Sequence, residues 1–209
     1  MKSSDLTSRP KTGANPEGKG VSGFLADWHA TEPRGIVAKP QRQVLAELFT
    51  SMLVLSASFK YRPVPGVLNY LYWMDGQWSL SLIAPQQWSQ QRRDNYVGMC
   101  MLHNDMTWTI DPSERLAEDS PVASAVRRYY AAFAEMLNTR QTLEEILPFH
   151  VGSLPYYQRL YAAALSRSVA STLSRSEHMS ISCRDWRKQL SYGKHELPAR
   201  VGLDPSASH

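Results

Sequence analysis

His103 and Asp105 are the two residues whose types and spacing come nearest to a catalytic pair. They flank the predicted tight turn His103-Asn104-Asp105 and share strand parity, so their side chains can point the same way. An imidazole beside a carboxylate can carry out general acid–base chemistry. The alternative is structural, because an aspartate at a turn commonly accepts hydrogen bonds from the backbone of that turn. We favour the structural interpretation and keep the pair as a candidate site.

The remaining residues with chemical potential do not form a recognised constellation. Cys100 and His103 have the spacing of a C-x-x-H metal fragment, but their odd separation places them on opposite faces of a strand. Glu144 and Glu145 diverge by about 100° on a helix, so they are not a carboxylate pair. The sequence contains no phosphate-binding glycine loop, nucleophile elbow or dinucleotide fingerprint. We therefore expect no metal and no cofactor, and we leave enzymatic activity open while favouring its absence.

Two groups of residues are candidates for binding a partner. Arg92 and Arg93 follow Trp88 and lie near predicted strand tyrosines, and a basic and aromatic surface of this kind can bind an anionic or nucleic-acid ligand. The alternative, which we favour, is that these arginines are solvated and the aromatic side chains belong to the core. Tyrosines also occur on more than one side of two predicted helices, and exposed aromatic patches usually mark contact surfaces. The candidate contact residues on these helices are Tyr130, Tyr157 and Tyr161.

A β-hairpin at Asp75-Gly76 begins the set of elements that positions these residues. Asp-Gly supplies the positive φ angles of a two-residue type I′ turn, and runs rich in β-branched and aromatic residues flank it. The turn sets a register in which Trp73 faces Trp78, and a slip by one residue would move the large apolar side chains to the other face. Two later segments also read as strands, so residues 67–110 are predicted to form a β-meander of three or four strands.

Helices are predicted on both sides of the meander in the sequence. Apolar residues at three- and four-residue steps predict a helix over residues 39–60 and further helices within 120–174. Ser120, followed by a proline, is the expected N-cap of the first of these later helices. Thr142 and Glu145 have the spacing of a capping box, which opens a short helix.

The order and spacing of residues in the meander carry a resemblance. The motifs are Y-L-Y at 70–72, S-L-I-x-P-x-x-W at 81–88 and D-M-x-W at 105–108. Over roughly residues 67–110 this pattern resembles the core of a family of proteins of unknown function, DUF2452. That family has no established activity, cofactor or catalytic residues. The resemblance therefore implies an uncharacterised protein and does not choose among functions.

Length and charge set the expected domain organisation. The chain has 209 residues, of which 43% are hydrophobic, enough for one domain with a real core. We predict a single domain over residues 23–174, which begins with an extended arm over 23–39. A disordered tail is predicted over 1–22 and a mostly disordered basic tail over 175–209. Residues 1–43 and 175–209 carry net charges of +3 and +2, whereas residues 44–174 carry −1, so any nucleic-acid association is expected through the tails.

The cysteines and the hydropathy indicate the compartment. Cys100 and Cys183 are the only cysteines, no disulfide is expected between them, and a reducing cytoplasm is the simpler interpretation. The most apolar segment, residues 44–59, is shorter than the roughly 20 apolar residues that a membrane span needs. We therefore expect a cytoplasmic protein that does not enter a membrane.

The sequence predicts an α+β fold in which a small antiparallel β-meander packs against flanking helices. The leading hypothesis is a non-enzymatic module that binds a protein partner or a second copy of itself through the tyrosine-bearing helices. The second hypothesis is an enzyme or small-molecule-binding protein that uses the His103–Asp105 turn. The third is a nucleic-acid-associated protein that binds through its basic tails.

Overall fold

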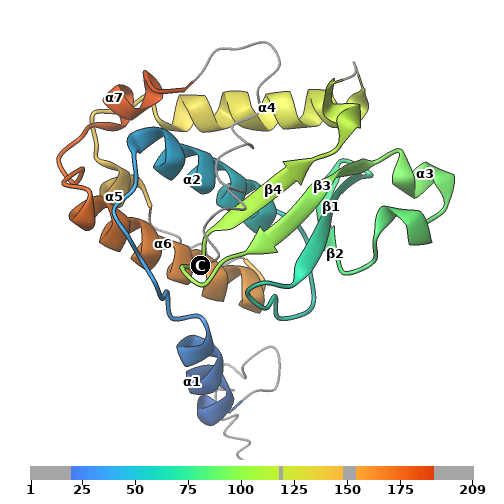
Figure 1. Ribbon diagram of the computed structural model, residues 1–209, viewed down its shortest axis with the longest axis horizontal. Helices are drawn as coiled ribbons and strands as arrows, with labels where there is room; N and C mark the ends of the chain where they lie inside the picture. The colour runs from blue at the N-terminus through green and yellow to red at the C-terminus, as the bar shows by residue number, and fades with distance from the viewer. Residues whose placement is uncertain (1–19, 118–119, 148–153, 191–209) are drawn as a thin grey trace, which may run out of the picture.

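The fold is α+β, as predicted: a four-stranded antiparallel sheet with helices packed against it (Figure 1). The computed structural model describes residues 20–117, 120–147 and 154–190. The strands are β1 (Leu68–Met74), β2 (Gln77–Ser81), β3 (Tyr96–Leu102) and β4 (Trp108–Pro112). The helices are α1 (Val21–Ala30), α2 (Gln41–Leu55), α3 (Gln90–Arg93), α4 (Pro121–Met136), α5 (Leu143–Ile146), α6 (Tyr156–Arg175) and α7 (Cys183–Arg187), with short 3-10 helices η1 (Pro85–Gln87) and η2 (Glu114–Ala117).

The β1–β2 hairpin has the predicted turn and register. Asp75 and Gly76 have φ angles of 52° and 77°, the left-handed conformation that a type I′ turn requires. Trp73 pairs with Trp78 across the two strands, and their ring centroids are 4.4 Å apart. A cross-strand aromatic pair of this kind contributes about 0.5–1.5 kcal/mol beyond the area that it buries.

The strand order β2-β1-β3-β4 differs from that of the predicted meander. In a meander β3 would lie beside β2, but here β3 pairs with β1. The far edge of β2 is already occupied by Ser58, whose N–H donates to the Trp78 carbonyl at 2.9 Å and whose carbonyl accepts from the Leu80 N–H at 3.1 Å. The chain therefore returns through η1 and α3 to the open edge of β1.

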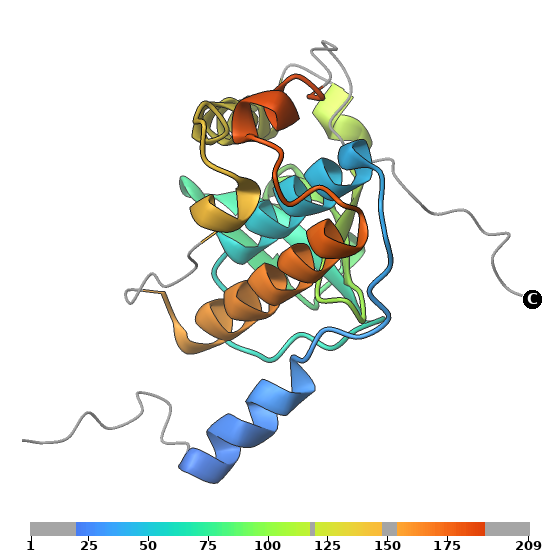
Figure 2. The same ribbon diagram turned by 90° about the vertical axis from the view of Figure 1, so that its left-hand side faces the viewer.

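Helices α2, α4 and α6 lie on one side of the sheet, and the core forms between them and the inner face (Figures 1 and 2). At the β4 edge the Trp108 N–H donates to the Ser51 Oγ of α2 at 2.8 Å, which joins the sheet to this helix. In the described ranges, every helix falls short of the length and apolar character needed to span a bilayer. The largest fully buried side chains include Trp108, Trp186, Leu48, Leu53, Leu71, Leu102 and Leu165.

The helix starts of the second half were predicted correctly. The Ser120 Oγ accepts a hydrogen bond from the Ala123 N–H at 3.0 Å, and a proline follows it at the first helical position of α4. The capping box of α5 is complete, because Thr142 and Glu145 each accept from the other's backbone N–H. These caps satisfy N–H groups that a helix leaves without an internal partner.

The two ends differ from the sequence prediction. Residues 21–30 form helix α1, whereas an extended arm was predicted to begin at residue 23. Residues 175–190 were assigned to a disordered tail, but this segment contains α7, whose Cys183 and Trp186 are completely buried. The rest of both predicted tails, residues 1–19 and 191–209, lies outside the described residues.

Candidate functional site

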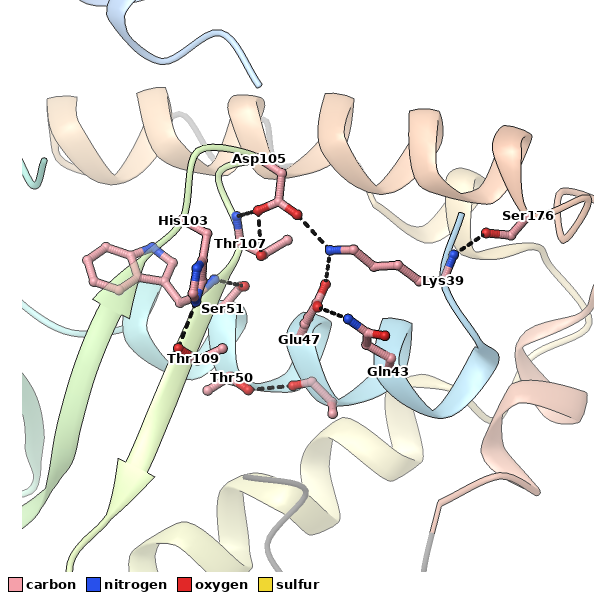
Figure 3. A network of polar contacts seen from close by, with 12 residues as sticks. Lys39, Gln43, Glu47, Thr50, Ser51, His103, Asp105, Thr107, Thr109 and Ser176 are labelled. Carbon is pink, nitrogen blue, oxygen red and sulfur yellow. Dashed lines mark hydrogen bonds and ion pairs between the residues drawn. The ribbon is translucent and has the colours of Figure 1, made fainter. Parts of the chain in front are cut away.

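A buried cluster of three charged side chains surrounds the turn that holds Asp105 (Figure 3). The ammonium group of Lys39 lies 2.6 Å from the Oδ2 atom of Asp105 and 2.6 Å from the Oε2 atom of Glu47. The side chains of Lys39, Asp105 and Glu47 are 7%, 11% and 12% exposed. Lys39 precedes α2, Glu47 lies on α2 and Asp105 lies between β3 and β4, so the cluster joins three parts of the chain.

Hydrogen bonds hold Lys39 and Asp105 in their charged forms. Burial pushes the pKa of Asp105 upward, but hydrogen bonds from Lys39 and Thr107 outweigh it, and the pKa lies below its usual value. Burial pushes the pKa of Lys39 downward, but the bonds to Asp105 and Glu47 outweigh it, and the pKa lies above its usual value. The second oxygen of Glu47 accepts from Gln43 Nε2 at 2.9 Å. The cluster is therefore a structural clamp, in which Asp105 is a poor proton donor and Lys39 a poor nucleophile near neutral pH.

His103 and Asp105 have different hydrogen-bond partners. His103 Nε2 lies 2.8 Å from Thr109 Oγ1 on the neighbouring strand. Asp105 Oδ1 accepts from the Thr107 N–H at 3.1 Å and from the Thr107 hydroxyl at 2.7 Å. This is the turn-capping role that was the structural alternative for Asp105. The geometry thus supports the structural interpretation of this residue, and acid–base chemistry by the pair remains a prediction.

The C-x-x-H fragment does not converge on one point. Cys100 is completely buried on the inner face of β3, and its thiol lies 3.8 Å from the Gly98 carbonyl. His103 contacts Thr109 at the other side of the sheet. Among the described residues, no group of three or more His, Cys, Asp or Glu side chains is arranged to hold a metal ion.

The outer face of the sheet, opposite the helices, carries an apolar strip. By strand alternation Leu68 and Tyr70 point to this face, and the register places them opposite Met101 and Met99 of β3. Leu68 is 43% exposed and the other three are half-buried. Ile83, 40% exposed, follows β2 at the edge of this face, where its carbonyl accepts from the hydroxyl of Tyr72 at 2.9 Å. We call Leu68, Tyr70, Ile83, Met99 and Met101 the outer strip.

Aromatic and basic groups flank one end of this strip. Tyr72 and Tyr96 stand side by side with ring centroids 5.6 Å apart, and burial raises the pKa of Tyr72 to about 12. On the connection that follows Ile83, the Arg92 guanidinium lies 4.0 Å from the centre of the Trp88 ring. Arg92 and Arg93 are both exposed, as predicted for solvated arginines. The strand tyrosines, in contrast, belong to the outer face and not to the core beneath the helices.

The helical tyrosines are more buried than a contact surface requires. Tyr161 is only 3% exposed and donates a hydrogen bond to the Pro63 carbonyl, so it cannot meet a partner. Tyr130 is half-buried and packs edge-on against Phe49 of α2, with ring centroids 5.4 Å apart. Tyr157 is half-buried beside Tyr156. The prediction was wrong for Tyr161, and Tyr130 and Tyr157 contribute to packing.

Sequence reasoning did not identify Lys39, Glu47 or the outer strip. A lone lysine in a Pro- and Gly-rich segment has no local signal that it will pair with a carboxylate 66 residues away. The outer strip did have a signal. Residues 99–102 read Met-Cys-Met-Leu, so both faces of β3 are apolar although helices cover only one.

The molecule is thus an α+β protein with a charge clamp at one turn and an apolar outer sheet face. The model of a family described as a protein of unknown function, DUF2452, matches residues 36–129. This match confirms the resemblance seen over residues 67–110 and extends it to Lys39 and into α4. No curated protein and no solved structure was found to match the chain.

Proposed function

We propose that the protein is a non-enzymatic module that binds a protein partner through the outer strip. The observation that carries this proposal is the apolar character of a sheet face on the side away from α2, α4 and α6. Leu68 is 43% exposed and lies opposite the half-buried Met101 in the register, and Ile83, after β2, is 40% exposed. Contiguous exposed apolar groups on a sheet cost solubility unless another surface covers them.

The composition of the strip favours a protein as the bound molecule. It contains two methionines, a tyrosine and two branched aliphatic residues, and none of the five is charged. Interface centres are enriched in aromatic residues and methionine and depleted of charged residues. Methionine also adapts its shape to different apolar partners. A nucleic-acid site would instead combine stacking rings with a positively charged track, and here Asp111 is exposed directly opposite Met99 in the register.

The remaining hypotheses have less support. A catalytic pair of His103 and Asp105 would need the two side chains to contact each other. Instead, each side chain contacts a threonine, His103 with Thr109 and Asp105 with Thr107. Binding of nucleic acid through the tails has no support from residues 175–190, which contain the folded helix α7, and otherwise concerns residues 1–19 and 191–209, outside the described part of the chain. We also propose a cytoplasmic location, which the two buried cysteines, both in the free thiol form, support.

The test compares two charge insertions in the full-length chain. Leu68→Glu places a carboxylate in the outer strip, whereas Met179→Glu places one at an exposed methionine beyond α6 and is the matched control. Wild type and both variants are immobilised and exposed to a lysate of the native cells, and retained proteins are quantified by mass spectrometry. Circular dichroism and thermal unfolding verify that both variants fold.

We expect at least one protein that wild type and Met179→Glu retain equally and that Leu68→Glu loses at least fivefold. The same retained proteins in all three samples would sink the proposal. A labelled single-stranded oligonucleotide, measured by fluorescence anisotropy, is the second ligand. If it binds wild type and not Leu68→Glu, the strip is a nucleic-acid surface and the proposed protein partner is wrong.

A further inference from the structure

Helix α1 carries a second exposed apolar surface, on the same chain as the outer strip. Its residues Val21, Phe24, Leu25 and Trp28 recur at three- and four-residue steps and therefore share one side of the helix. We call these four residues the stripe of α1. Val21, Phe24 and Leu25 are 77%, 41% and 47% exposed. Both views show α1 standing away from the body formed by the sheet and the other helices (Figures 1 and 2).

The C-terminal end of α1 is held firmly, so the exposed stripe has a defined direction. Asp27 is buried and accepts from the Tyr156 hydroxyl at 2.9 Å and from Arg62 at 3.3 Å. Arg167 stacks on the Trp28 ring at 4.1 Å and donates to the Thr31 carbonyl at 3.2 Å. These contacts use the polar side and the end of the helix. They leave the outward part of the stripe, Val21, Phe24 and Leu25, facing solvent.

We propose that α1 of one copy docks on the outer strip of a second copy, and that two such contacts close a symmetric dimer. This inference rests on the proposed function, because it names the partner of the outer strip. Neither the strip nor the stripe contains a charged residue, so an apolar contact between them leaves no charge without a partner. The sizes are also compatible: the exposed residues Val21 to Leu25 extend about 6 Å along the helix, and the strip, which lies on β1, β3 and the chain after β2, spans about 10 Å across strands about 4.8 Å apart.

The area of contact favours a closed dimer over a single contact. One helix of this length on a sheet buries on the order of 300 Å² from each partner. One contact therefore buries about 600 Å² in total, well below the roughly 1,200–2,000 Å² in total that stable interfaces bury. Two reciprocal contacts bring the total to about 1,200 Å², the lower end of that range. In a two-fold symmetric dimer the strip and the stripe of both copies are covered, whereas a head-to-tail contact that does not close would produce filaments.

The experiment measures self-association of the full-length chain by sedimentation velocity over a concentration series. The variants are Phe24→Glu in the stripe, Leu68→Glu in the strip and Ala26→Glu as the control. Ala26 is exposed and lies about 140–150° around the helix from the centre of the stripe. We expect wild type and Ala26→Glu to form dimers, and each of the other two variants to dimerise at least about tenfold more weakly.

An equimolar mixture of Phe24→Glu and Leu68→Glu gives the decisive readout. In the mixed dimer the intact helix of the Leu68→Glu copy meets the intact strip of the Phe24→Glu copy, so one of the two contacts is restored. We expect the mixture to associate more tightly than either variant alone. No gain on mixing, or a wild type that stays monomeric throughout, overturns the inference.

The outcomes for the two proposals are distinguishable. If Phe24→Glu dimerises like wild type and Leu68→Glu does not, the strip binds something other than α1, so the inference falls and the proposed function stands. If Phe24→Glu no longer dimerises and Leu68→Glu dimerises like wild type, α1 docks on a surface other than the strip, and the inference is wrong. The lysate comparison then decides the proposed function independently.

Discussion

Replacing Lys39 by methionine is expected to be among the most damaging single substitutions in the described chain. The substitution keeps the apolar length of the side chain and removes one positive charge from between two carboxylates. It deletes two charge-assisted hydrogen bonds of 2.6 Å and leaves Asp105 and Glu47 facing each other with little access to water. Removing one partner of a buried ion pair typically costs about 3–5 kcal/mol. We expect a loss of that size at pH 7, measured by urea unfolding.

The loss of stability caused by Lys39→Met should depend on pH in a defined direction. In wild type the pKa of Asp105 lies below its usual 3.8, so its stabilising contribution is complete above that value and is lost as the pH falls through the lower folded pKa. The pKa of Lys39 lies above its usual 10.5, so its contribution is complete below that value and is lost as the pH rises through the higher folded pKa. The stability gap between wild type and Lys39→Met is therefore widest between about pH 6 and 10.

Below pH 6 the difference in stability between wild type and Lys39→Met should become smaller. Without Lys39, burial raises the pKa of Asp105, and the variant gains stability by binding a proton as the pH falls toward 4. The triple substitution Lys39→Met, Glu47→Gln and Asp105→Asn removes all three charges and should recover most of the lost stability, because a neutral replacement leaves no charge without a partner. If Lys39→Met costs less than about 1 kcal/mol at pH 7, or if its gap to wild type is the same at pH 4, the clamp is not a buried ion cluster and the reasoning is wrong.

Three further predictions concern packing. Gly98→Ala should destabilise the protein by about 3 kcal/mol or more, measured by urea unfolding. The added Cβ would lie 2.5 Å from the Asp111 carbonyl oxygen and 2.8 Å from Ile110. A loss of stability near zero would contradict the pairing of β3 with β4. Trp186→Ala should cost about 3–5 kcal/mol, against almost nothing for the exposed Arg184→Ala, and equal effects would mean that α7 does not belong to the fold. Burial raises the pKa of the Cys100 and Cys183 thiols, that of Cys183 to about 11. Ellman's reagent at pH 8 should therefore modify neither cysteine until urea unfolds the chain. Fast modification of the native protein would contradict this burial.

Local signals predicted much of the fold because they are decided within a few residues. Asp75-Gly76 selects a type I′ turn by its backbone preferences alone, and the register of the whole hairpin follows from the turn. The caps at Ser120 and Thr142 depend on side chains that reach only three residues along the chain. Each of these features is set by residues that lie close together in the sequence.

Features set by distant contacts were the ones that the sequence did not predict. The order of β2, β1 and β3 depends on Ser58 occupying the edge of β2, and no local pattern indicates that bridge. The clamp depends on Lys39 meeting two carboxylates from different elements. Residues 183–187 form a short helix whose stability comes from burying Trp186, which hydrophobic periodicity cannot detect over so few residues.

The candidate site was predicted in part, and for a physical reason. Asp105 was identified as a possible turn cap because Asp at such a position commonly binds its own backbone. The choice of Tyr161 as a surface residue was wrong because tyrosine is amphipathic and a buried ring can satisfy its hydroxyl with a carbonyl. Phe24, Leu25 and Trp28 did show helical spacing in the sequence, but glycines and prolines on either side made an extended arm the expected structure.

The binding role of the outer strip is most directly tested by the oxidation rates of its methionines. Met99 and Met101 lie in the strip, and the exposed Met179 serves as an internal control in the same molecule. Hydrogen peroxide converts accessible methionines to sulfoxides, and mass spectrometry measures each rate in the free chain and in its complex with a second copy or with a captured protein. The account predicts that Met99 and Met101 oxidise at least fivefold more slowly in the complex while Met179 keeps its rate. Equal rates for Met99 and Met101 in the free and bound states would contradict it.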